Sequence, residues 1–242
     1  MKTILFAAYG GGHIKLLLPL IKHFRLNSNY RVVVLALTTA RFDCERNGID
    51  FLSYEDFLDS SDRRAFLYGK HFLSKLSDQR IPDSESIAYM GLSYLDLVNR
   101  IGRKEARTVF REIDRHAFLP YTIADRILGK LKPDLVITTN SPKTERALVE
   151  RATSHSIPSI CVNDLFGLNA PWFKLRTFAT KICVINEWVR DLCINHYSRD
   201  HNDIVVTGNP AFDPIQRNAP LDPAHSKKIL FASQANPLRN PW

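Results

Sequence analysis

Cysteine is scarce in this 242-residue chain, and the four that occur have no C-x-x-C spacing: Cys44, Cys161, Cys183 and Cys193. Such a sequence lacks both the paired cysteines of a disulfide framework and the ligand spacing of a zinc site. Reduced thiols in a cytoplasmic protein explain these residues best. We expect no metal site.

Long apolar runs are also missing. No segment approaches the roughly 18 apolar residues that span a bilayer. The run TILFAAY near the N-terminus is too short for a signal peptide, and glycines follow it instead of a cleavage pattern. We therefore expect a cytoplasmic protein.

Negative charge is in deficit, because 25 Asp and Glu face 33 Lys and Arg and give a formal net charge of +8. This balance favours an anionic partner such as nucleotide phosphates, an anionic membrane surface or nucleic acid. A basic protein with dispersed charge explains it equally well. The hydrophobic fraction of 45% is ordinary for a globular protein with a proper core.

Strand and helix patterns alternate at both ends of the chain. Short apolar runs, typical of parallel strands buried on both faces, occur at 3–9, 30–37, 48–54, 132–140, 157–164, 179–186 and 203–210. Helical patterns occupy 13–26, 141–155 and 187–197 between them. This rhythm predicts an α/β fold with a doubly wound, Rossmann-like parallel sheet of about seven strands and helices on both faces.

The stretch from about 55 to 130 differs, because it is charged, contains many Leu, Phe and Tyr residues and has no β-branched run. We expect a helical insertion there. Its clearest helix spans 100–115, where basic residues at spacings of three and four form one face: Arg100, Arg103, Lys104, Arg107, Arg111 and Arg115. This face is either a solvated outer surface or an anion-binding one.

The C-terminal part changes character again. Residues 216–226 have the proline-rich, aperiodic composition of a linker, and 227–232 resemble one more buried strand. We therefore expect an N-terminal domain at 1–215 and the start of a second, truncated domain at 227–242.

Three consecutive glycines, Gly10, Gly11 and Gly12, stand between the first strand and the first helix, and His13 follows them. Glycines there let a ligand approach the backbone, and the helix directs its free N–H groups at that ligand. The positive end of the helix dipole favours a neutral imidazole, as a general base requires. The alternative is a tight turn with a solvent-exposed or capping histidine.

Known phosphate and dinucleotide motifs do not fit this loop. The G-x-G-x-x-G spacing is absent, no acidic residue follows the second strand, and no Lys-Ser/Thr pair ends a P-loop. We therefore expect no bound cofactor.

Other polar residues follow later strands, whose carboxyl ends are the usual ligand site of an open parallel sheet. Asp164 is a second candidate acid or base, although an N-cap or turn role suits it as well. Asn140 and Ser141 are expected to cap the following helix, with ligand contact as the alternative.

Two segments resemble a known family. The sequence GGGHIKLLLPLIKHF is similar to the first loop and helix of GT-B glycosyltransferases, within the group of the lipid II N-acetylglucosaminyltransferase and the galactolipid synthases. The sequence VVTGNPAFDPI resembles the T-G-N-P segment of the same enzymes and of UDP-N-acetylglucosamine 2-epimerases. The resemblance covers residues 1–15 and 132–232.

The resemblance implies that the glycine loop and His13 lie near the donor diphosphate and the acceptor. It implies substrate contacts for Gly208, Asn209 and Pro210 as well. Two departures matter. Ala211 and Phe212 stand where the lipid II enzyme has an arginine. The acidic catalytic residues of the epimerases fall on Ser141 and Leu165, which argues against epimerase chemistry.

The resemblance thus implies the acceptor-binding half of a GT-B glycosyltransferase. The donor would be a nucleotide-sugar, and the acceptor a glycan or a lipid-linked molecule of cell-envelope or polysaccharide synthesis. The insertion at 55–130 would select the acceptor, and the basic segment 100–115 would contact an anionic membrane peripherally. We expect no nucleic-acid partner.

Alternative functions are a nucleotide-sugar hydrolase, an epimerase-like enzyme and a non-catalytic binding subunit. Donor binding in GT-B enzymes depends chiefly on the second domain. Residues 1–242 alone are therefore expected to be inactive and to bind nucleotide-sugars weakly.

Overall fold

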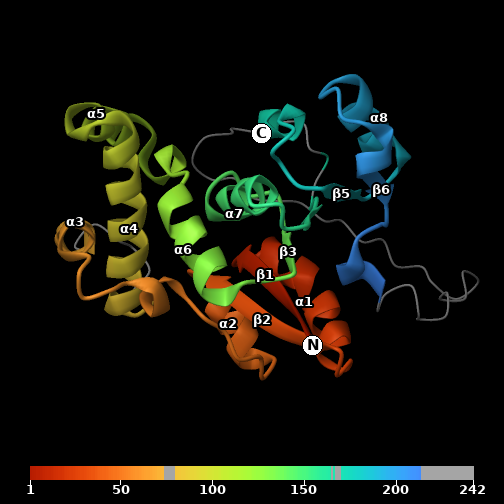
Figure 1. Ribbon diagram of the computed structural model, residues 1–242, viewed down its shortest axis with the longest axis horizontal. Coiled ribbons are helices and arrows are strands. Elements are labelled where there is room, and N and C mark those ends of the chain that lie inside the picture. Colours follow the sequence, from red (N-terminus) through yellow and green to blue (C-terminus); the bar gives the residue numbers. More distant parts are fainter. Residues whose placement is uncertain (74–79, 165, 167–169, 214–242) are drawn as a thin grey trace, which may run out of the picture. The chain divides into compact units, whose positions relative to one another are not determined.

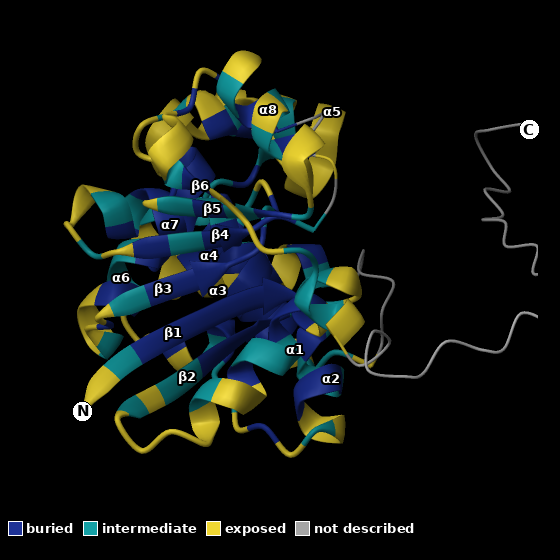
Figure 2. Cartoon of the chain, turned by 90° about the vertical axis from the view of Figure 1, so that its right-hand side faces the viewer, coloured by how far each residue is buried: buried dark blue, intermediate teal, exposed yellow. Residues whose placement is uncertain are grey.

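A six-stranded parallel sheet forms the centre of the protein, in the strand order β2-β1-β3-β4-β5-β6 (Figures 1 and 2). The computed structural model describes residues 1–73, 80–164, 166 and 170–213. The strands are β1 Lys2–Tyr9, β2 Tyr30–Leu37, β3 Leu135–Thr138, β4 Ser159–Val162, β5 Lys181–Val184 and β6 Ile204–Val206. All five strand pairings are parallel, so the doubly wound, Rossmann-like prediction is confirmed.

One expected strand is absent from this sheet. Segment 48–54 contributes only an isolated bridge between Leu52 and Leu35. The chain then enters a short 3₁₀ helix, Tyr54–Phe57, whose capping box is formed by Ser53 and Asp56. This turn limits the pairing to one residue. The strand expected at 227–232 lies outside the described residues.

The two faces of β1 belong to two hydrophobic clusters because successive side chains of a strand alternate. Ile4, Phe6 and Ala8 pack against α1 (Gly12–Arg25) and α2 (Ala40–Arg46). Leu5 and Ala7 pack on the opposite face, where α7 (Thr144–Ser154) and α8 (Glu187–Asn195) contribute. A continuous apolar run is therefore what a strand buried on both faces requires.

The insertion is helical, as expected, and joins the second cluster. It contains α3 (Arg63–Leu73), α4 (Asp83–Ile101), α5 (Arg103–Ile113) and α6 (Tyr121–Leu131). Helices α3 and α4 approach closely at two glycines: a Cβ on Gly69 would clash with the backbone of Ile87, and one on Gly91 with that of Ala65. The compact unit spans Met1–Ala211 and includes the insertion.

The basic segment 100–115 is broken, contrary to the single helix that its spacing predicts. Gly102 has φ +84°, a conformation that side-chain-bearing residues rarely adopt, and α4 ends there. Arg100 therefore lies on α4 and is paired with Asp96, whereas Arg115 lies in a 3₁₀ turn, Asp114–Ala117.

The remaining short 3₁₀ helices are Pro171–Lys174, His201–Asp203 and Pro210–Phe212. Over the described part of the chain, none of the helices combines the length and the apolar character needed to cross a membrane.

Candidate functional site

The carboxyl ends of three neighbouring strands bring the candidate residues together. Strand β1 lies between β2 and β3, so the chain order reverses at the β1–β3 boundary. In open parallel sheets, ligands bind in the crevice at such a switch point. Here β1 leads into Gly10–His13, β3 into Thr139–Ser141 and β4 into Asn163–Asp164.

The three glycines of the loop have three different surroundings. A Cβ on Gly10 would overlap Thr39, whose own Cβ and carbonyl carbon would be 2.8 and 2.9 Å away. Gly11 has φ +71°, which favours glycine, and Gly12 begins α1. Apart from the adjoining backbone, no atom of the described residues lies within 4 Å of a Cβ built on Gly11 or Gly12. Packing against Thr39 therefore explains the glycine at position 10, and the positive φ explains the one at position 11. Gly12 borders open space.

His13 lies in the first turn of α1, and its side chain is 28% exposed. Its Nδ1 lies 2.5 Å from the hydroxyl of Thr139, in the loop after β3. The same nitrogen lies 3.7 Å from Asp164 Oδ2 and 4.0 Å from Glu145 Oε1. Two loops and the first turn of α7 thus converge on one imidazole.

The sequence analysis missed two members of this site, Thr139 and Glu145. Glu145 lies in the first turn of α7 and is fully buried. Its Oε1 accepts the backbone N–H of Tyr9 at 2.8 Å, and its Oε2 accepts the hydroxyl of Thr139 and, at 3.3 Å, the N–H of Ser141. Burial raises the pKa of this carboxyl, and the nearby imidazole of His13 opposes that effect.

A sequence signal for Glu145 did exist. Glu145, Leu148, Val149 and Ala152 stand at positions i, i+3, i+4 and i+7 of one helix face, and all four are buried. A carboxylate on an apolar helix face needs a partner, because an unpaired buried charge is strongly unfavourable. The partners come from other loops, so the helical pattern alone does not reveal them.

Asp164 approaches His13 with one carboxylate oxygen, and its other oxygen, Oδ1, is buried without a hydrogen-bond partner in the described part. Its backbone N–H donates to Asn140 Oδ1 at 3.4 Å. The helix-capping prediction for Asn140 and Ser141 is wrong: the N-cap of α7 is Lys143, without a side-chain cap bond. The N-cap lies two residues beyond Ser141. The Ser141 backbone N–H donates to the Glu145 carboxylate instead.

Gly208, Asn209 and Pro210 follow β6 on the same edge of the sheet but are not part of this cluster. Gly208 has φ +76°, and Asn209 Oδ1 accepts the N–H of Ala211 at 2.9 Å. Four strand spacings separate β6 from β1, which corresponds to roughly 19 Å.

The hydrogen bonds assign a tautomer to His13. The single proton of the Thr139 hydroxyl goes to Glu145, so the hydroxyl oxygen accepts a hydrogen bond from His13 Nδ1–H. The Asp164 carboxylate near Nδ1 favours the same assignment. A neutral imidazole then carries its lone pair on Nε2, which is the form of a general base.

Metal binding has no candidate in the described part of the chain, where no group of three or more His, Cys, Asp and Glu residues is placed to hold an ion.

Several solved structures resemble this chain in fold. An S. aureus MnaA–UDP structure matches with a TM-score of 0.52 and 14% identity, over 89% of this chain and 46% of the other. A UDP-GlcNAc 2-epimerase from Neisseria meningitidis bound to UDP-GlcNAc matches with 0.50 and 13%, over 89% and 49%. Acinetobacter baumannii MurG matches with 0.50 and 14%, over 93% and 48%.

These similarities concern the fold alone, because the sequence identities are 13–14%. The fold is GT-B-like. The chain spans about half the length of each of these structures. No protein-family model and no curated protein sequence matches the chain.

The glycine loop provides a matched pair of substitutions. Gly10→Ala should lower the free energy of unfolding by about 1–3 kcal/mol, because its Cβ meets the Thr39 backbone. Gly12→Ala should leave it unchanged or raise it by up to about 1 kcal/mol, because that position is helical and open. Urea unfolding of both variants measures the difference. Equal losses would contradict the loop geometry.

Glu145 should make stability depend on pH. Its pKa is raised above 4.5 in the folded state, so the folded protein binds this proton more tightly than the unfolded chain. The contribution of Glu145 to the free energy of unfolding therefore decreases as the pH rises above the unfolded-state value. Glu145→Gln cannot titrate and should lack this decrease. Denaturant titrations of both proteins between about pH 4 and about pH 8 measure this contribution as the difference between them. Parallel plots of the free energy of unfolding against pH would refute the role of Glu145.

Proposed function

We propose that this chain forms the acceptor-binding domain of a glycosyltransferase that uses a nucleotide-sugar donor. Its acceptor would be a glycan or a lipid-linked molecule of cell-envelope or polysaccharide synthesis. The observation that carries the proposal is the position of His13, which lies at the β1–β3 switch point beside Gly12 and is oriented by Thr139. Two of the similar structures contain UDP or UDP-GlcNAc, which supports a nucleotide-sugar substrate.

In the proposed reaction, His13 is the general base. The acceptor hydroxyl gives its proton to Nε2 while its oxygen attacks the anomeric carbon of the donor sugar. The bond from that carbon to the nucleoside diphosphate breaks, and its electron pair leaves with the diphosphate. The imidazolium that results is stabilised by Asp164 at 3.7 Å and by Glu145 at 4.0 Å.

The start of α1 would bind phosphate oxygens. The first N–H groups of the helix have no partner within the helix and form the positive end of its dipole. The open space at Gly12 leaves room for a phosphate there. Gly208, Asn209 and Pro210 would contact a more distant part of the substrates, because β6 is four strands away.

Segment 103–111 would place the enzyme at an anionic membrane. Helix α5 is largely exposed (Figure 2), and only Ala106 is buried on it. In the described part of the chain, none of its four basic residues forms an ion pair: Arg103, Lys104, Arg107 and Arg111. Unpaired surface charges of this kind attract anionic headgroups.

The catalytic role of His13 is tested by His13→Ala in the complete protein. Turnover with a panel of nucleotide-sugars and glycan acceptors should decrease by about 10²–10⁴-fold, because general-base catalysis is lost. His23→Ala is the matched control, since His23 is exposed on the same helix. Thermal unfolding of both variants should match the parent. Undiminished turnover of His13→Ala would exclude it as the base.

Product analysis of the same reactions tests the proposed function itself. A new glycosidic product that depends on the acceptor supports transfer. Free sugar released without an acceptor would identify a hydrolase, and an epimerised nucleotide-sugar an epimerase. Binding without any reaction would identify a binding subunit.

Membrane contact is tested by cosedimentation with vesicles that contain phosphatidylglycerol. Arg107→Gln with Arg111→Gln should reduce partitioning by about thirty-fold at low salt, because each basic residue contributes about 1 kcal/mol. Lys2→Gln with Arg31→Gln is a control of equal charge at exposed positions on the opposite edge of the sheet. Equal effects of the two pairs would show only an attraction of net charge.

A further inference from the structure

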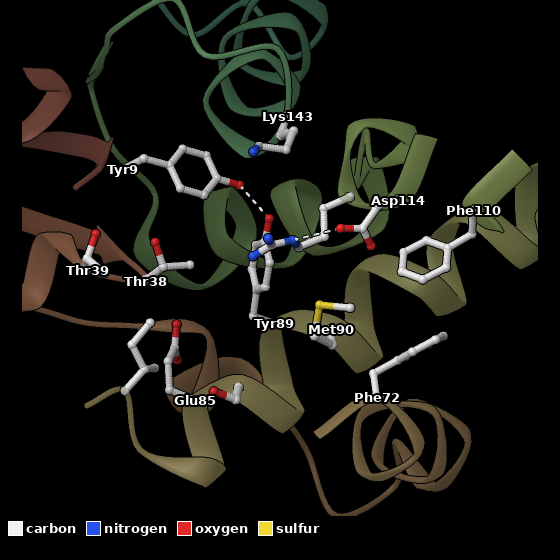
Figure 3. Close-up of a pocket in the computed structure, with 13 residues that line it drawn as sticks. Tyr9, Thr38, Thr39, Phe72, Glu85, Tyr89, Met90, Phe110, Asp114 and Lys143 are labelled. Atoms are coloured by element: carbon white, nitrogen blue, oxygen red, sulfur yellow. Dashed lines mark hydrogen bonds and ion pairs between the residues drawn. The ribbon is translucent and has the colours of Figure 1, made fainter. Parts of the chain in front are cut away.

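A cavity of about 350 Å³ lies beside the His13 site, between the strand ends and the inserted helices (Figure 3). Tyr9 lines it from the end of β1, and the pair Thr38–Thr39 lines it from the turn after β2. Glu85, Met90 and Phe110 line it from α4 and α5. Its volume is at the lower end of the range of small-molecule sites, about 300–1,000 Å³. We call this cavity the insertion chamber.

One side of the insertion chamber is cationic. Lys143 and Arg115 both line it, and the Lys143 ammonium lies 4.8 Å from the centre of the Tyr9 ring. No carboxylate of the described residues forms an ion pair with Lys143. Burial and the Arg115 guanidinium lower the pKa of Lys143. Two cations placed near each other in a partly desolvated cavity are stabilised by an anion between them.

Arg115 is available for such an anion. Among the described residues, its guanidinium pairs with the neighbouring Asp114 at 3.4 Å, and both side chains are half exposed or more. An exposed ion pair of this length contributes little to the free energy of folding. With Asp114 offsetting one of the two cations, the chamber retains one positive charge when Glu85 is neutral.

Glu85 provides a polar group on another wall. The residue is 1% exposed, and its Oε2 accepts the N–H of Glu55 at 3.0 Å. Its Oε1 is buried and has no hydrogen-bond partner among the described residues. Burial raises the pKa of this carboxyl to about 7. Buried polar atoms without partners are rare in folded proteins, and a ligand group is one explanation for them.

The third wall is apolar. Phe72, Met90 and Phe110 face the chamber from α3, α4 and α5 in Figure 3. Aromatic rings and a thioether suit the C–H face of a sugar ring, which is less polar than its hydroxyl-bearing edge. The hydroxyls of Thr38 and Thr39 on the strand side complete a lining that is polar at one side and apolar at the other.

We propose that the insertion chamber binds a sugar that carries one negative charge, a carboxylate or a phosphate. The anion lies between Lys143 and Arg115, the sugar ring packs against Met90 and Phe110, and a hydroxyl reaches Glu85. The inference that this sugar belongs to the acceptor rests on the proposed function, whereas its binding does not.

The chamber and the catalytic residues share Tyr9. The backbone N–H of Tyr9 donates to Glu145, which supports His13 through Thr139, while the Tyr9 side chain lines the chamber. A ligand in the chamber therefore lies directly beside the glycine loop, where an acceptor is required.

Calorimetry on residues 1–242 tests the proposal with glucuronate, glucose 6-phosphate and glucose. At least one anionic sugar should bind about tenfold or more tighter than glucose, as a charge-assisted hydrogen bond predicts. The preferred anion identifies the ligand class. Equal binding of the three sugars, or inorganic phosphate binding as tightly as glucose 6-phosphate, would overturn the proposal.

Substitutions locate the anion. Lys143→Met should weaken binding of the preferred sugar about 10- to 100-fold, whereas Lys104→Met on the exposed surface of α5 should have no effect. Arg115→Met, at an exposed position, is a second variant if Lys143→Met does not fold. Unchanged affinity in a folded Lys143→Met or Arg115→Met protein would refute the site.

The affinity for glucuronate should also depend on pH. Ionisation of Glu85 adds a negative charge, so binding should weaken as the pH rises through about 7. Glu55 and Arg41 face Glu85 from other elements, and Lys143, Arg115 and Asp114 face it across the chamber. Glu85→Gln should remove this dependence while these groups remain. An unchanged pH profile in that variant would exclude Glu85 from the site.

The two proposals fail separately. Anionic-sugar binding without any sugar transfer would refute the glycosyltransferase and leave the insertion chamber as a binding site. Sugar transfer without binding in the chamber would support the glycosyltransferase and refute the insertion chamber as a binding site.

Discussion

Parallel pairing of β1 with β2 on one side and β3 on the other is the constraint on which the rest of the structure depends. It places the loops after β1 and β3 next to each other and leaves a crevice between them. His13 and Thr139 meet across this boundary, although 126 residues separate them in the sequence. The catalytic candidates and the insertion chamber both lie at the same edge of the sheet.

Glu145 connects the sheet to the proposed chemistry. Its carboxylate is fully buried, and it accepts hydrogen bonds from the end of β1 and from the loop after β3. These bonds fix the relative position of the two loops and the orientation of the Thr139 hydroxyl. One buried acidic residue therefore supports both the local structure and the tautomer of His13.

The insertion adds a second cavity to this arrangement. Helices α3 and α4 pack closely on each other at Gly69 and Gly91, and both contribute to the hydrophobic cluster on one face of the sheet. The chamber that results combines two cations, a carboxyl of raised pKa and an aromatic wall.

The sequence by itself determined the local structure, because the relevant forces act between near neighbours. Continuous apolar runs indicated strands buried on both faces, glycines followed by a helical pattern placed His13 in the first turn of α1, and the absence of β-branched runs indicated a helical insertion. The breaks at Gly102 and after Leu52 were missed, because spacing alone does not show where a turn stops a helix or a strand.

Only the tertiary structure decided which residues share a site. Thr139, Glu145 and Asp164 meet His13 because β1, β3 and β4 are adjacent, whereas Gly208 is four strands away. Long-range pairing also explains the burial of Glu145 and Glu85, whose raised pKa values arise from surroundings that distant segments supply. Sequence periodicity reports which face of an element is buried, but the partners on that face depend on the order of strands in the sheet.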